Sequence, residues 1–109
     1  MAKLIINKAT SDTTGSIVAA NAIIGFDTIF KWGTMEIHYN LVVYRSQEDY
    51  EAGKSSIYLN EIPNYGIVKT MTEQEYLDLL SNGALAVFWL KNILVAAGNF
   101  INDDLTISN

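Results

Sequence analysis

The chain has 109 residues, of which 50% are apolar and 11% aromatic, enough to build the core of one domain spanning residues 1–109. It contains no cysteine, which excludes disulfides, thiolate catalysis and cysteine-bound zinc, so we expect folding without a metal or cofactor. Twelve acidic and seven basic residues give a net charge of -5, and the basic residues are scattered singly. A nucleic-acid partner is not expected, because phosphate binding depends on grouped Lys and Arg.

The first elements of the chain are short and rich in β-branched residues. Lys3–Asn7 predicts a strand, and the Ser, Thr, Asp and Gly residues between 8 and 16 predict a turn or loop. Ser16–Phe26 favours a second strand, because its valine and isoleucines suit a pleated sheet and no capping signal precedes it. We expect Gly25 to mark a bulge or bend in this strand.

A hairpin is predicted next. Thr28–Trp32 forms its first arm, and Gly33 is expected to supply a positive φ in the tight turn. Met35–Arg45 is the clearest strand of the chain, because apolar and polar residues alternate along it. Near its end, Val42 and Tyr44 make both faces apolar, which predicts a cover on both sides, from the C-terminal helices or from another subunit.

The polar stretch after this strand predicts a corner. Ser46 suits a helix N-cap, Gln47–Ala52 a single helical turn, and Gly53 the left-handed residue that ends it. Ser55–Ile62 is expected to return as a strand, which gives a long β-hairpin with a small helix at its tip. Pro63-Asn64 breaks that strand.

Residues 65–71 predict another short strand, followed by a helix with a clear start. Thr72 and Glu75 have the spacing of a capping box, so the helix begins at Glu73, and Asn82-Gly83 is suited to end it. Its apolar stripe is expected to consist of Tyr76, Leu79 and Leu80.

A second helix is predicted over Ala84–Ala97, before Gly98, and its only polar residues are Lys91 and Asn92. One sheet in a domain this small buries only part of such a helix, so the remainder predicts an association surface. We expect the core to take Leu85, Phe88, Ile93 and Ala96. The candidate interface residues are Trp89, Leu90 and Leu94, which are expected to be partly open in the monomer, together with the aromatic anchors Tyr44 and Tyr50.

Neither a secretion signal nor a membrane span is expected. The opening MAKLIINKATSD has three consecutive strongly apolar residues before polar ones resume. The apolar helix rises about 21 Å, less than the roughly 30 Å of a bilayer core. We therefore expect a protein made in the cytoplasm with no membrane partner.

These elements predict an α+β fold: an antiparallel β-sheet or small β-sandwich with long hairpins, packed by two C-terminal helices. The tail, residues 101–109, is expected either to add an edge strand or to be loose.

Groups suited to catalysis are scarce. His38, the single histidine, shares the polar face of its strand with Glu36 and Asn40, an arrangement that suits an acid-base group or half of a metal site. Alternation alone requires polar residues on that face, so we expect a solvent-facing histidine. GIVKT at 66–70 lacks the glycine spacing of a phosphate loop. No catalytic residue, cofactor or metal ligand is therefore expected.

The stretch MEIHYNLVVYRSQEDYEAGKSSIYLNEIPNYGIVKTMTEQEYLDLL, Met35–Leu80, resembles a segment of small virion proteins of tailed bacteriophages. The pattern is a hydrophobic strand, YRSQEDYEAGKSSIY, a second strand, and the helix start MTEQEY. The resemblance covers less than half the chain and carries no catalytic residue. It implies a structural subunit of a head, neck or tail assembly, located in the virion and bound to other virion proteins.

The main hypothesis is accordingly a non-enzymatic virion protein, expected to form a homo-oligomer. A small inhibitor or binding module that sequesters a host protein through its acidic surface is the alternative. An enzyme is the third hypothesis.

Overall fold

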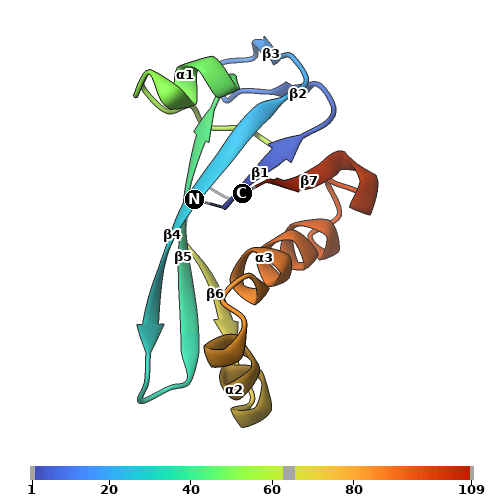
Figure 1. Cartoon of the computed structure of the whole chain (residues 1–109). Coiled ribbons are helices and arrows are strands. Elements are labelled where there is room, and N and C mark those ends of the chain that lie inside the picture. Colours follow the sequence, from blue (N-terminus) through green and yellow to red (C-terminus); the bar gives the residue numbers. More distant parts are fainter. Residues whose placement is uncertain (1, 63–65, 109) are drawn as a thin grey trace.

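The computed structural model describes residues 2–62 and 66–108, and its fold is α+β, as the sequence predicts (Figure 1). Five antiparallel strands form the main sheet in the order β6-β5-β4-β1-β7, and β2 and β3 form a small second sheet. The elements in chain order are β1 (Lys3–Ile6), β2 (Thr10–Ser11), β3 (Ile17–Val18), β4 (Ala22–Lys31), β5 (Glu36–Tyr44), α1 (Gln47–Glu51), β6 (Ile67–Thr70), α2 (Glu73–Ser81), α3 (Leu85–Ala96), the 3-10 turn η1 (Asn102–Asp104) and β7 (Leu105–Ser108).

One face of the main sheet carries the hydrophobic core, and α3 packs against it (Figure 1). We call this the inner face. Tyr39 of β5 is fully buried there, and its hydroxyl donates a 2.6 Å hydrogen bond to the carbonyl oxygen of Ala86 in α3. The strand and helix residues of this core include Leu4, Ile6, Ala22, Ile24, Ile37, Tyr39, Val43, Ile67, Val87, Leu90, Leu94 and Leu105.

The opposite, outer face is covered at one end by α1. Ile23 of β4, paired in register with Tyr44 of β5, is buried on this face. The Tyr44 and Tyr50 rings meet edge to face with centroids 5.4 Å apart, and Lys3 lies over the Tyr50 ring at 5.5 Å. The apolar second face predicted near the end of β5 is therefore covered by the chain's own short helix, which neither sequence alternative proposed.

The β4–β5 hairpin differs from the prediction in its irregular positions. Its pairing runs unbroken through Gly25, opposite Val42, so the predicted bulge is wrong. The break comes earlier, at Asn21 with φ 77, between β3 and β4. The positive φ predicted for Gly33 is also wrong, because Met35 takes that conformation with φ 53. A Cβ would meet nothing at Gly33, so no contact requires glycine there.

The corner at α1 forms as predicted. The Ser46 hydroxyl accepts a 3.1 Å hydrogen bond from the Asp49 amide, and Gly53 follows the helix with φ 65. The returning strand predicted over Ser55–Ile62 is wrong, because this segment makes only isolated bridges, Val43 with Ile57 and Asp12 with Leu59. Its other partner is the loop around β2, which diverts it from β5. The predicted break at Pro63-Asn64 lies outside the described residues.

The capping box and the start of α2 are confirmed, with reciprocal hydrogen bonds between Thr72 and Glu75. Leu79 is buried and Tyr76 is half-buried, as expected, but Leu80 is 63% exposed, so its place in the apolar stripe is wrong. The tail forms the edge strand β7, paired with β1 from Leu105 to Ser108, which agrees with the first of its two alternatives.

Candidate interaction surface

The most apolar helix, α3, uses one side for the core. Val87, Leu90 and Leu94 recur at the spacing of one helix face and lie against the sheet. Leu90 is 0% exposed and Leu94 1%, so the prediction that they are partly open in the monomer is wrong. The predicted core positions Phe88 and Ala96 are exposed instead, while Leu85 and Ile93 are half-buried.

A second row of residues, which we call the α3 stripe, lies on the rest of the helix surface, and its half-buried members Leu85, Trp89 and Ile93 also pack against the core. Phe88 is the most exposed large side chain of the α3 stripe. The exposed fraction of 49% is high for a phenyl ring, which is usually buried. Asn92 is the one polar residue in the row. The α3 stripe consists of Leu85, Phe88, Trp89, Asn92, Ile93 and Ala96.

Phe88 stands between two open hollows. One, of about 340 Å³, is bounded by the start of α3, Leu85 and Ile107 of the edge strand β7. The other, of about 420 Å³, is bounded by Trp89, Asn92 and Ile93 along the α3 stripe and by Lys69 and Glu75 beside it. A protruding ring flanked by depressions is suited to packing with side chains from another chain.

Trp89 anchors the edge of the α3 stripe. Lys69 of β6 places its Nζ 5.1 Å from the centroid of the Trp89 ring and 2.9 Å from Oε2 of Glu75. The pKa of the Glu75 carboxyl lies below its ordinary value, mainly because of the hydrogen bond from the Thr72 amide and also because of Lys69. Trp89 is consequently half-buried, and its exposed part keeps it a candidate interface residue.

The other predicted anchors, Tyr44 and Tyr50, lie far from α3, in the cluster under α1. Both are half-buried, and their rings contact each other. Their contribution to holding α1 on the sheet is clear, whereas a role in an interface stays a prediction.

His38 lies on the outer face, as predicted, with its Nε2 3.2 Å from Oε1 of Glu36. The hydrogen bond from His38 is the main cause that lowers the pKa of the Glu36 carboxyl, and the Thr34 hydroxyl adds to it. Within residues 2–62 and 66–108, no group of three or more His, Cys, Asp and Glu side chains is placed to hold a metal ion. In the same ranges, no helix combines the length and apolarity needed to cross a membrane.

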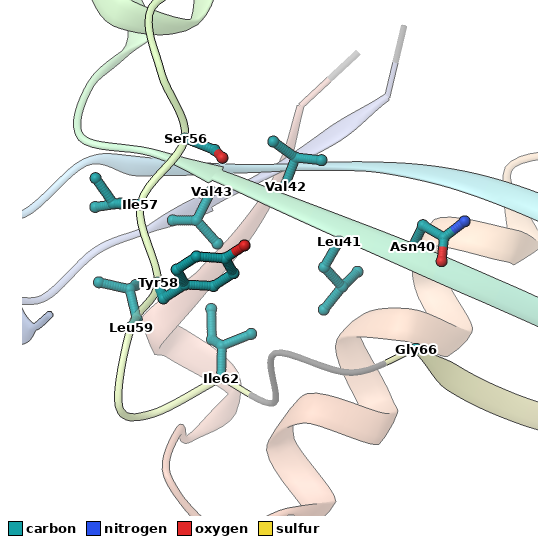
Figure 2. Close-up of a pocket in the computed structure, with 10 residues that line it drawn as sticks. All are labelled: Asn40, Leu41, Val42, Val43, Ser56, Ile57, Tyr58, Leu59, Ile62 and Gly66. Atoms are coloured by element: carbon teal, nitrogen blue, oxygen red, sulfur yellow. The ribbon is translucent and has the colours of Figure 1, made fainter. Parts of the chain in front are cut away.

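A smaller hollow, of about 190 Å³, lies between the end of β5 and the irregular segment 56–62 (Figure 2). Figure 2 shows Leu41, Val43 and Ile62 projecting toward it, with the Tyr58 ring across its middle. None of the ten labelled lining residues is charged, and the Tyr58 phenol is the one acid-base group among them.

Sequence reasoning missed two exposed apolar residues of the outer face. Ile29 of β4 and Val68 of β6 lie on either side of His38 in register. They are 50% and 48% exposed. The alternation of β5 indicated which of its residues face outward. The sequence did not predict which residues of β4 and β6 lie beside them, because short apolar strands do not fix the pairing register.

Comparison of the chain with family models, curated proteins and solved structures finds no match.

Proposed function

We propose that the protein is a non-enzymatic structural subunit of a bacteriophage virion, in the head, the neck or connector, or the tail. It acts through contacts with other virion proteins and with copies of itself, and it enters the particle after synthesis in the host cytoplasm. The resemblance of Met35–Leu80 to virion proteins supports the class, and the exposed α3 stripe supports the mode of action.

The observation that carries the proposal is the exposure of Phe88 in the middle of the α3 stripe. Burying the exposed half of a phenylalanine against a partner contributes about 1 kcal/mol, so this residue favours association. Trp89 and Ile93 extend the apolar area on one side and Leu85 on the other. Clusters of exposed apolar side chains of this kind are typical of sites that contact another protein.

Charge also suits contact between acidic chains. Lys91 is the only charged residue of the segment 84–101, although the chain as a whole carries a charge of -5. The α3 stripe therefore presents no carboxylate of its own to an acidic partner, and the Glu75 carboxylate beside it is paired with Lys69. Like-charge repulsion between two acidic chains is therefore small at the α3 stripe.

The net charge is the observation that favours the alternative, a small inhibitor of a host protein. Carboxylates of Glu48, Asp49 and Glu51 cluster on α1, away from α3. An inhibitor of this kind stays monomeric and co-purifies with one host protein through that acidic end.

Quantitative mass spectrometry of purified particles of the phage that encodes the chain tests the proposal. We expect the chain in a stoichiometric amount relative to the major capsid protein, retained after the particles are washed with high salt. Absence from the particles, together with recovery in complex with one host protein, would contradict the proposal and support the inhibitor.

A further inference from the structure

The outer face of the sheet carries an open patch at the end of the β4–β5 hairpin remote from α1. Figure 1 shows α2 and α3 together on one side of the lower half of this hairpin, with α1 at its upper end. The outer face of the lower half is therefore left uncovered by helices. We call its residues the outer-face patch: Asp27, Ile29, Lys31, Glu36, His38, Asn40 and Val68.

Register arranges the outer-face patch in rows across the strands. The central row is Ile29, His38 and Val68, with the two aliphatic side chains about half exposed. Lys31, paired in register with Glu36, lies on one side of this row, and Asp27, paired with Asn40, lies on the other. Each charge is two residues from Ile29, about 6.6 Å along the strand.

These two charges are available to a partner. Asp27 and Lys31 are both exposed, and neither forms an ion pair with any residue of the ranges 2–62 and 66–108. The row has two half-exposed aliphatic side chains on either side of His38, with an acid beyond it in one direction and Lys31, beside Glu36, in the other. Such a row is complementary to its own copy, provided that the copy runs in the opposite direction.

A two-fold axis across the strands, through the central row, provides this arrangement. It places Ile29 opposite Ile29 of the second copy and brings Lys31 of each copy opposite Asp27 of the other. Facing sheets lie about 10 Å apart, a gap that a lysine side chain can bridge. An axis along β5 instead places Lys31 opposite Thr70 and leaves both charges without partners.

We propose that the outer-face patch binds the same patch of a second copy in an antiparallel, two-fold dimer. The inference deepens the proposed function and rests on it for the need for contacts between copies. It adds a second interface on the side of the sheet opposite the α3 stripe, so one chain can contact a copy and a further virion protein together.

Sedimentation velocity of the purified chain, over a concentration series, tests the dimer with charge variants. Asp27→Lys places two lysines in each symmetric contact, and Lys31→Asp places two aspartates there. We expect each variant alone to raise the dimer dissociation constant about tenfold or more. An equimolar mixture of the two variants restores acid-base pairing at both contacts, so a heterodimer forms with close to the wild-type constant.

The chain offers matched controls. The double variant Asp27→Lys/Lys31→Asp keeps both pairs within a homodimer and is expected to dimerise like the wild type. Ile29→Glu places a carboxylate opposite its own copy at one end of the row and abolishes the dimer, whereas Ile17→Glu, at an exposed residue of β3, leaves it intact. Circular dichroism checks that each variant is folded.

Three results would overturn the inference: a wild-type chain that is monomeric up to about 1 mM, single variants that dimerise as the wild type does, or a mixture no tighter than its components. A monomeric chain found in stoichiometric amount in particles would end this inference and leave the proposed function standing. A confirmed dimer of a chain absent from particles would do the reverse.

Discussion

At the scale of single residues, one carboxylate organises the loop between β2 and β3. Oδ1 of Asp12 accepts hydrogen bonds from the Thr14 hydroxyl at 2.7 Å and from the amides of Thr14 and Ser16 at 3.0 and 2.9 Å. Its Oδ2 accepts a 2.7 Å hydrogen bond from Arg45, just after β5. These donors lower the pKa of Asp12 from 3.8 to about 2, with the Thr14 hydroxyl as the largest cause.

We predict a specific pH dependence of stability for Asp12→Asn. Because folding lowers the pKa of Asp12, its charge stabilises the native state fully above pH 3.8 and loses this effect as the pH falls through about 2. The variant should therefore unfold at lower urea than the wild type at pH 6, and the difference should shrink toward pH 2.

Urea unfolding followed by circular dichroism at pH 6, 4 and 2 measures this. Asp103→Asn, at an exposed aspartate, is the matched control and should show no such convergence. A difference between the Asp12 variant and the wild type that stays constant or grows as the pH falls would contradict the assignment.

At the scale of elements, the signals that predicted correctly are local ones. The start of α2 depends on the capping pair Thr72 and Glu75, and the ends of α1 depend on Ser46 and Gly53. Each of these residues lies within one turn of the helix end that it stabilises. The alternation along β5 arises because one face of the strand is buried. Ile37 and Tyr39 on that face are both fully buried.

The missed features depend on contacts between distant segments. Ser55–Ile62 has the composition of a strand, but its backbone bonds to the loop near β2. The Asn60 amide donates to the Ser11 carbonyl, and the Tyr58 carbonyl accepts from the Thr13 amide. These hydrogen bonds replace those that a strand would make with β5. The sequence does not predict which side of α3 faces the sheet. A helix that is apolar on nearly every side has no polar face to mark its solvent side. The excess of apolar surface was predictable, and the side that exposes it was not.

We predict that two substitutions on opposite sides of α3 separate folding from association. Leu90→Ala removes a fully buried side chain and should lower the free energy of unfolding by about 2–5 kcal/mol. Phe88→Ala should change it by less than about 1 kcal/mol, because half of that ring is already in water. Urea denaturation gives both values.

Binding gives the second readout for this pair. Phe88→Ala, though folded, should be incorporated poorly into particles, whereas an equally stable surface variant, Ile101→Ala, should be incorporated normally. A Phe88→Ala chain as destabilised as Leu90→Ala would show that the ring belongs to the core, contrary to the account.

At the scale of the whole molecule, the sheet separates two surfaces of different character. The α3 stripe is mostly apolar and borders two hollows, and the outer-face patch is a row of two aliphatic side chains around His38 with opposite charges on either side. A subunit that contacts neighbours on both sides of its sheet can be part of an extended assembly, whereas a single self-complementary surface closes as a dimer.

Hydroxyl-radical footprinting of Phe88 and Trp89, in the free chain and in purified particles, tests the central claim that another protein covers the α3 stripe. Both side chains should be oxidised in the free chain and strongly protected in the particle, while exposed Ile17 and Ile101 report general accessibility. Equal oxidation of Phe88 in the two states, with the chain present in the particle, would contradict it.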